Sequence, residues 1–97
     1  MLALMGTKRD ITILPARGCR RSRKALEYLE AHSIPFTRIE LESLEGQALT
    51  AQYDLRASPG ILVDDASINP FDLLLQPECR VDEAAAQLIF VGEEQRA

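Results

Sequence analysis

The sequence predicts an α/β fold in which strands and helices alternate, and three consecutive patterns near the N-terminus indicate it. A short apolar run at residues 11–14 is followed by a helical pattern over residues 19–32 and an alternating pattern over residues 36–41. Strand, helix and strand in this order, within about thirty residues, are typical of a βαβ unit with parallel strands.

The first helix is amphipathic. Its charged side chains occupy the other faces, and residues 33–35 end it because Ile34 precedes a proline and is excluded from the α region. The face expected to point inward holds four small or apolar side chains, Ser22, Ala25, Leu26 and Leu29.

The run at residues 36–41 alternates as a half-buried strand should, with Thr37, Ile39 and Leu41 on one face. A second and weaker helix is expected to start after a Ser43 N-cap and to reach Tyr53, although Gly46 lowers its helix propensity.

Residues 60–65 read as a short buried strand that ends in a turn, and residues 66–68 as its antiparallel return. Asn69 suits an N-cap, Pro70 the first helical position and Asp72 the first turn, so a short helix ending at Pro77 is expected there. The last helix should begin after Asp82 and close near Gly92, with its inward face formed by Ala84, Ala85, Leu88 and Ile89. The expected element order is β-α-β-α-β-β-α with an additional C-terminal helix.

Length and composition indicate one soluble globular domain spanning residues 1–97, with residues 1–9 as a mobile N-terminal segment. The chain is 46% hydrophobic and 27% charged, as is ordinary for such domains. It carries no signal for oligomerisation, so we expect a monomer.

Charge is unevenly distributed along the chain. The formal net charge of -4 argues against nucleic-acid binding. Residues 1–38 hold eight basic and three acidic side chains, whereas residues 39–97 hold three basic and twelve acidic ones. A basic patch around Cys19 would therefore attract a small anion or an acidic partner to that site.

Cysteine usage indicates a reducing, cytoplasmic location. Cys19 and Cys79 lie 60 positions apart, which fits neither a metal-binding cluster nor a disulfide framework, so no metal is expected. The apolar opening at residues 1–5 is too short for a signal peptide or a membrane span.

Cys19 is the main candidate for chemistry. It lies where a strand leads into a helix N-terminus and is flanked by arginines, and both features favour the thiolate. Ser22 and Arg23 share its helix face, so the hydroxyl can donate a hydrogen bond and the guanidinium can add positive charge. These effects predict a Cys19 pKa of roughly 4 to 6.5, against about 8.5 for an unperturbed thiol.

Three motifs together resemble the glutaredoxin branch of the thioredoxin-like family, over residues 10–76. They are the Cys-x-x-Ser at 19–22, the segment His-Ser-Ile-Pro-Phe at 32–36, and Ser58-Pro59 before the third expected strand. The resemblance implies a central four-stranded mixed sheet with helices on both faces and chemistry at Cys19. It also implies that Pro59 is cis and that the backbone of Ser58 pairs with an extended substrate.

The chain departs from the usual Cys-Pro-Tyr-Cys motif of this family, because Arg20 and Arg21 stand between Cys19 and Ser22. Without a second thiol at Ser22, a mixed disulfide on Cys19 must be resolved by external glutathione or by Cys79.

The resemblance also suggests substrate-binding residues. Arg17 and Arg21 are candidates to hold a glutathione carboxylate or an acidic partner loop, and Arg20 is included in the same basic set. Where the family has a Gly-Gly-x-Asp turn that contacts glutathione, this chain retains only the acidic residue, Asp72.

The sequence thus predicts a monothiol, glutaredoxin-like thiol–disulfide oxidoreductase with no bound cofactor, using glutathione as co-substrate or acting on a protein disulfide. A non-catalytic adaptor that binds a protein loop near Cys19, Ser58 and Pro59 is the first alternative. Arsenate reduction is a second one, because the Cys-x-x-Ser-Arg start at residues 19–23 is similar to that family. That family is longer, with an inserted helical part for which this chain has no room.

Overall fold

The centre of the molecule is a four-stranded mixed sheet. The computed structural model describes residues 9–75 and 80–91. The strands lie in the order β2-β1-β3-β4; β1 is parallel to β2 and antiparallel to β3, which is antiparallel to β4. Their bounds are β1 (Ile11–Leu14), β2 (Thr37–Arg38), β3 (Gly60–Val63) and β4 (Ala66–Ile68). The mixed four-stranded sheet expected for a thioredoxin-like fold is confirmed.

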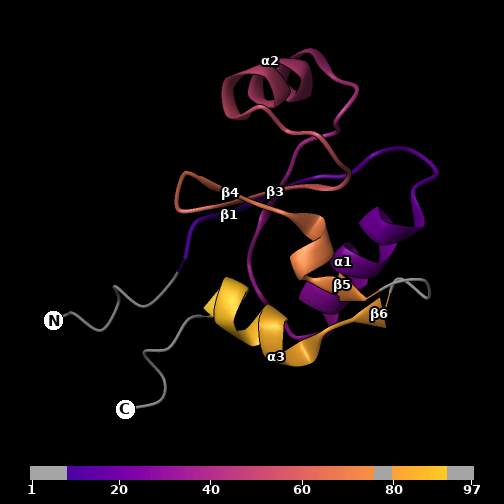
Figure 1. Cartoon of the computed structure of the whole chain (residues 1–97), viewed down its shortest axis with the longest axis vertical. Helices are drawn as coiled ribbons and strands as arrows, with labels where there is room; N and C mark the ends of the chain where they lie inside the picture. Colours follow the sequence, from indigo (N-terminus) through magenta and orange to yellow (C-terminus); the bar gives the residue numbers. More distant parts are fainter. Residues whose placement is uncertain (1–8, 76–79, 92–97) are drawn as a thin grey trace, which may run out of the picture.

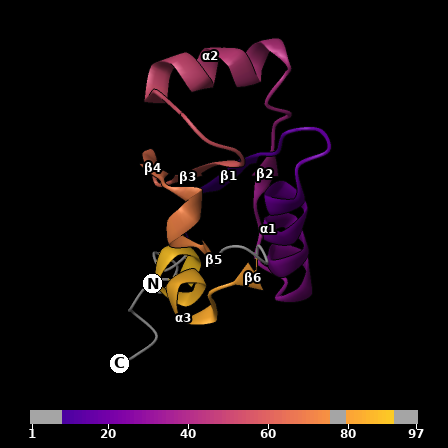
Figure 2. The same cartoon turned by 45° about the vertical axis from the view of Figure 1, so that its right-hand side comes forward.

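Helices cover both faces of this sheet, as expected. Helix α1 (Arg20–Ala31) and the C-terminal α3 (Glu83–Ala86) lie on one face, whereas α2 (Leu44–Tyr53) lies alone across the other (Figures 1 and 2). None of the helices in the described part of the chain is long and apolar enough to cross a membrane.

The main core lies between the sheet and the face that carries α1 and α3. The predicted inward face of α1 is confirmed, since Ala25 and Leu29 are fully buried and Leu26 and Ser22 nearly so. Strands β1 and β3 contribute alternate residues to the same core because successive side chains point to opposite faces. The cluster consists of Ile11, Ile13, Ala25, Leu26, Leu29, Ile61, Val63, Leu73, Leu74, Ala86 and Phe90.

Strand β2 is shorter than predicted, and its expected inward face is wrong in part. Thr37 is exposed, whereas Phe36 packs against the main core. Thr37 pairs with Thr12, which places both on the side of the sheet that faces α2. Gly46 is the one buried residue of α2, so the helix covers little of this side of the edge strand.

Helix α2 forms as predicted, with the Ser43 side chain accepting a hydrogen bond from the Gly46 N–H at 3.0 Å. The structure also explains why Gly46 is present although it lowers the helix propensity of this segment. A Cβ at Gly46 would collide with the backbone carbonyl oxygens of Glu40 and Leu41, so only glycine lets the helix approach so closely.

The turn between β3 and β4 uses Asp64 and Asp65, both with positive φ, as a two-residue hairpin requires. Beyond it, Asn69 caps the next element as predicted by accepting a hydrogen bond from the Phe71 N–H. That element is a single 3-10 turn, η2 (Pro70–Asp72), and not the expected helix.

A short antiparallel pair not predicted from the sequence follows, β5 (Leu74–Leu75) with β6 (Arg80–Val81). Leu73 and Leu74 are buried in the core there. Their packing explains why the chain leaves the helical conformation after η2 and does not continue as the predicted helix. The expected helix end at Pro77 lies outside the described residues, as do Cys79, Gly92 and residues 1–8 of the expected mobile segment.

The last helix begins after Asp82, whose side chain accepts from the Ala85 N–H, as predicted. It continues as a π-helical turn, η3 (Gln87–Val91). The predicted inward face is wrong in part, because Ala86 and Phe90 are buried while Leu88 is 55% exposed. The wider π turn rotates the side chains away from the 3.6-residue spacing on which the prediction rested.

Candidate active site

Cys19 is the N-cap of α1 and follows the loop that leaves β1. Gly18 has a φ of 72°, a left-handed conformation that brings the chain into the helix. The Cys19 N–H donates to the Ala16 carbonyl at 3.2 Å, and the Cys19 carbonyl accepts from the Arg23 N–H at 3.1 Å. The partly exposed thiol therefore lies at the positive end of the helix, as predicted from the sequence.

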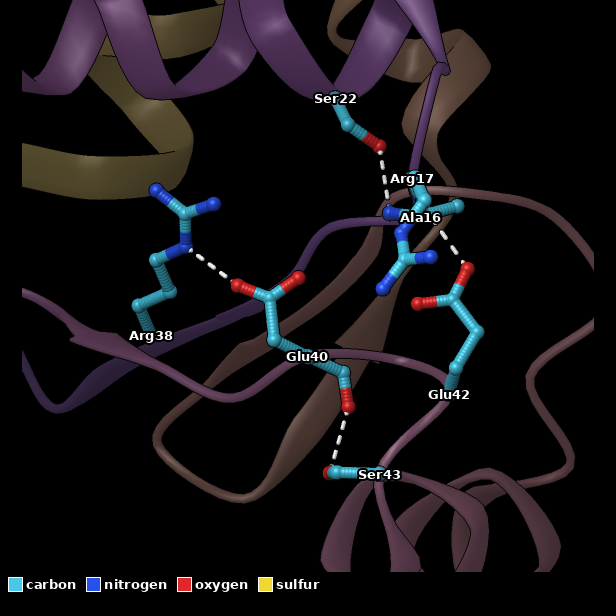
Figure 3. Close-up of polar contacts among 7 residues, drawn as sticks. All are labelled: Ala16, Arg17, Ser22, Arg38, Glu40, Glu42 and Ser43. Atoms are coloured by element: carbon cyan, nitrogen blue, oxygen red, sulfur yellow. Dashed lines mark hydrogen bonds and ion pairs between the residues drawn. The ribbon is translucent and has the colours of Figure 1, made fainter.

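Ser22 supports the loop from beneath. Its side chain is 2% exposed, and its Oγ accepts a hydrogen bond from the Ala16 N–H at 3.0 Å (Figure 3). Because a hydroxyl both accepts and donates, the same group is able to donate its proton to the Cys19 thiolate. Ser22 thus links the position of the loop to the state of the thiol.

Ser58 approaches the sulfur from a distant part of the chain. Its Oγ lies 3.2 Å from the Cys19 Sγ, and the Ser58–Pro59 peptide bond is cis, as the family resemblance implied. The segment is brought there because Gly60, the first residue of β3, pairs with Leu14, the last residue of β1. Only the backbone of Ser58 was predicted to contact a substrate. Its hydroxyl was not predicted as part of the site, although the place of Ser58 before the predicted cis proline was a usable signal.

The Arg21 side chain contacts Ser58 and does not extend freely into solvent. Its Nε donates to the Ser58 carbonyl at 2.7 Å, and its Nη2 is 3.5 Å from the Ser58 Oγ. The guanidinium carbon also lies 5.0 Å from the centre of the Phe71 ring, within cation–π range. The expected role of Arg21 in holding a substrate carboxylate thus has to compete with these contacts.

The Cys19 pKa is lowered to about 7, below the ordinary value of a thiol. Partial burial acts against this by raising the pKa, but side-chain hydrogen bonds from Ser22 and Ser58, a backbone hydrogen bond from Ser22 and the charge of Arg21 outweigh it. The direction of the prediction is confirmed. The value lies above the predicted range of roughly 4 to 6.5, because that prediction left out the cost of desolvating the thiolate.

A groove of about 410 Å³ lies along one side of Cys19. Arg23 on its wall is 63% exposed and lies 3.9 Å from Glu27 in a loose ion pair. Arg38 contributes a guanidinium from β2, held by a 2.7 Å contact between its Nε and the Glu40 carboxylate (Figure 3). The groove is basic, and its lining includes Arg17, Arg23, Arg38, Glu40, Leu26 and Ser22.

Arg17 is tied down through its backbone. Its N–H donates to the Glu42 carboxylate at 3.0 Å (Figure 3), and this hydrogen bond is the main reason that the pKa of Glu42 is lowered. Arg38, Glu40 and Glu42 were not predicted as site residues from the sequence. A topological signal was present, because the segments that follow two adjacent parallel strands emerge at the same edge of the sheet.

A second groove, of about 470 Å³, runs beside the cis proline and does not include Cys19. Its apolar lining comes from Leu55, Ala57, Pro59, Ile68, Pro70 and Phe71. Asp72 is exposed on η2 and lines neither groove, and Arg20 is exposed on α1 and likewise lines neither. Within residues 9–75 and 80–91 there is no group of His, Cys, Asp and Glu side chains placed to hold a metal ion.

Fold and site together define a thioredoxin-like domain with a cysteine at the start of its first helix, facing a cis-proline segment. Among solved structures, the chain is similar to glutaredoxin 1 from Francisella tularensis in complex with cacodylate. The identity is 19%, the alignment covers 63% of this chain and 81% of that chain, and the TM-score is 0.49. No protein-family model matches the sequence, and no curated protein matches it.

Proposed function

We propose that this protein is a monothiol, glutaredoxin-like thiol–disulfide oxidoreductase whose Cys19 thiolate exchanges with glutathione mixed disulfides or with a protein disulfide. The observation that carries this proposal is the place of the Cys19 sulfur, at a helix start and 3.2 Å from the Ser58 hydroxyl. With a pKa of about 7, about half of this thiol is ionised at neutral pH. The thiolate is the form that attacks disulfides.

In the first step the Cys19 thiolate attacks one sulfur of a glutathione mixed disulfide. A sulfur–sulfur bond forms between Cys19 and glutathione, the original disulfide bond breaks, and the former partner leaves as a thiolate that takes a proton from water. The partner is thereby reduced, and the glutathionyl group is now held on Cys19.

The second step needs an external thiol, because Ser22 cannot attack the mixed disulfide. A glutathione thiolate attacks the glutathione sulfur of the intermediate, oxidised glutathione leaves, and the Cys19 thiolate is restored. Glutathione is thus the two-electron donor of the cycle. Hydrogen bonds from Ser22 and Ser58 make Cys19 a good leaving group in this step because they stabilise its thiolate.

The basic groove supports glutathione as the co-substrate. Glutathione carries two carboxylates, and Arg17, Arg23 and Arg38 place positive charge beside the sulfur that it must reach. We therefore place the anionic part of the substrate in this groove, with Ser58 and Pro59 on the other side of the reacting sulfur.

The test is removal of glutathione from a glutathionylated peptide, measured with reduced glutathione as donor, for the wild type, Cys19→Ser and Cys79→Ala. We expect turnover by the wild type and by Cys79→Ala, and none by Cys19→Ser. Equal rates for the wild type and Cys19→Ser would overturn the proposal. If Cys79→Ala also loses turnover, the resolving thiol is Cys79 and not external glutathione.

The adaptor alternative keeps one specific support, the apolar groove beside Pro59, which is suited to a protein loop. It predicts that a partner bound there is retained by Cys19→Ser and lost by a charge-bearing substitution in the groove, such as Ala57→Glu. Absence of turnover combined with this binding pattern would favour the adaptor over the enzyme.

A further inference from the structure

The side chain of Arg21 connects three separate segments around the thiol. It starts from α1, which carries Cys19 at its N-cap, contacts the backbone and hydroxyl of Ser58, and lies over the Phe71 ring of η2. We propose that Arg21 is a positioning residue that holds the Ser58 hydroxyl against the Cys19 sulfur. This inference rests on the proposed function and deepens it, because it assigns how the thiolate is prepared.

The contact with the Ser58 carbonyl carries the positioning. At 2.7 Å it is a short, charge-assisted hydrogen bond, of the kind that is roughly twice as strong as a neutral one. It fixes the backbone of Ser58 with respect to α1, and therefore with respect to the sulfur. The second contact, from Nη2 to the Ser58 Oγ, is long at 3.5 Å and contributes less.

The segment before β3 needs such an anchor. At its C-terminal end Gly60 is tightly packed, because a Cβ there would lie 2.8 Å from a Leu55 methyl group and 3.1 Å from the Leu14 Cβ. Pro59 is also fully buried, so the segment is fixed from Pro59 onward, whereas Ser58 and Ala57 are only half-buried and Arg56 is exposed. A serine side chain has three staggered rotamers, so a fixed backbone is required before one of them reaches the sulfur reliably.

Phe71 completes the arrangement by holding the guanidinium itself. The ring is 47% exposed, which is unusual for a phenylalanine, and Arg21 covers one of its faces. A guanidinium stacked on a ring keeps its plane, and hence the direction of its N–H groups, better than one in open solvent. A lysine at position 21 would keep the charge but not this planar fork.

The position of the Arg21 side chain can be tested separately from its charge, because lysine keeps the charge and loses the planar guanidinium. Arg20 offers a matched control. Arg20 precedes Arg21 on α1 and is exposed, so Arg20→Lys makes the same chemical change away from Ser58. All variants are made in a Cys79→Ala background, where only Cys19 titrates as a thiol. The readout is the Cys19 pKa, taken from thiolate ultraviolet absorbance against pH, and it does not depend on turnover.

We expect Arg21→Lys to raise the Cys19 pKa by about half a unit or more although the charge is kept, and Arg20→Lys to leave it unchanged. In a Ser58→Ala background the effect of Arg21→Lys should largely vanish, because the hydroxyl that it positions is gone. Phe71→Leu, which leaves both arginines in place, should shift the pKa in the same direction by less.

Two results would overturn the inference: an Arg21→Lys pKa within error of that of Arg20→Lys, or an equal Arg21→Lys shift with and without Ser58. The second result would assign Arg21 a role independent of that hydroxyl. The proposed function fails in a different measurement, if the wild type and Cys19→Ser remove glutathione at equal rates. The two failures are therefore distinguishable.

Discussion

The Cys19 sulfur and the Ser58 hydroxyl lie 3.2 Å apart although 39 positions separate the two residues in the sequence. The pair joins the start of α1 to the cis-proline segment before β3, and it brings a hydrogen-bond donor to the thiolate from outside the helix. The thiol is therefore tuned by tertiary structure as well as by its own helix.

Replacement of Ser58 by alanine tests this relationship directly. We expect Ser58→Ala to raise the Cys19 pKa by about one unit, since a hydrogen bond to a charged group contributes about 1.5 kcal/mol or more. The measurement is the pH dependence of thiolate absorbance in a Cys79→Ala background. Ser67→Ala in β4, an exposed position, is the control, and an identical pKa in the two variants would contradict the expectation.

The reactivity of Cys19 should follow a pKa of about 7. The rate of alkylation by iodoacetamide is expected to rise about tenfold per pH unit below pH 7 and to level off above about pH 8. A rate already level at about pH 6 would instead support the stronger activation predicted from the sequence.

The same pKa has a consequence for stability. The folded-state value of about 7 lies below the ordinary thiol pKa that applies in the unfolded chain, so ionised Cys19 favours the folded state. This contribution is fully present above about pH 9 and is lost as the pH falls towards and through 7. Urea unfolding of the wild type and Cys19→Ser should therefore show a difference in free energy that grows from pH 6 to pH 9. A difference that stays constant with pH would contradict it.

Ser22→Ala should both destabilise the fold and weaken the thiolate. The partly buried Ala16 N–H would lose its acceptor at a cost of about 1 kcal/mol, and Cys19 would lose a hydrogen bond that lowers its pKa. Urea unfolding and the Cys19 titration measure the two effects. Ser67→Ala again serves as the exposed control, and a stable variant with an unchanged pKa would show that Ser22 does neither.

Gly46→Ala should be destabilising even though alanine is the better helix former. The new methyl group would meet the Glu40 and Leu41 carbonyls, and relieving that collision moves α2 at a cost of about 1 to 3 kcal/mol. The control is Ala48→Gly in the same helix, at an exposed position, where the cost should be about 1 kcal/mol from propensity alone. An unchanged or raised urea midpoint for Gly46→Ala would contradict the close approach.

Charge reversal in the basic groove should affect anionic substrates selectively. Arg23→Glu is expected to lower kcat/KM for glutathione mixed disulfides several-fold at low salt, and the loss should shrink as salt screens the charges. Arg20→Glu makes the same charge change outside the groove and should have a smaller effect. The comparison is made with glutathionylated and uncharged disulfides, and equal losses on both would contradict an electrostatic role.

Local patterns in the sequence were enough to predict most elements and the place of the candidate reactive cysteine at a helix start. The helical spacing of Ala25 and Leu29 predicted α1 and its inward face. The N-caps Ser43, Asn69 and Asp82 predicted where α2, η2 and α3 begin. These signals are reliable because a cap or a periodic face acts within one or two turns of chain.

Tertiary structure decided the features that depend on distant neighbours. The extent of β2, the π turn that buries Phe90, and the β5–β6 pair follow from how segments pack on the core, which no local pattern contains. The site divides in the same way. The sequence by itself placed Cys19 at a helix start among arginines, because the strand-to-helix turn is local. Only the folded chain decided that Ser58 would reach its sulfur and that Arg21 would contact Ser58, because short-range hydrogen bonds depend on three-dimensional distance and not on position along the chain.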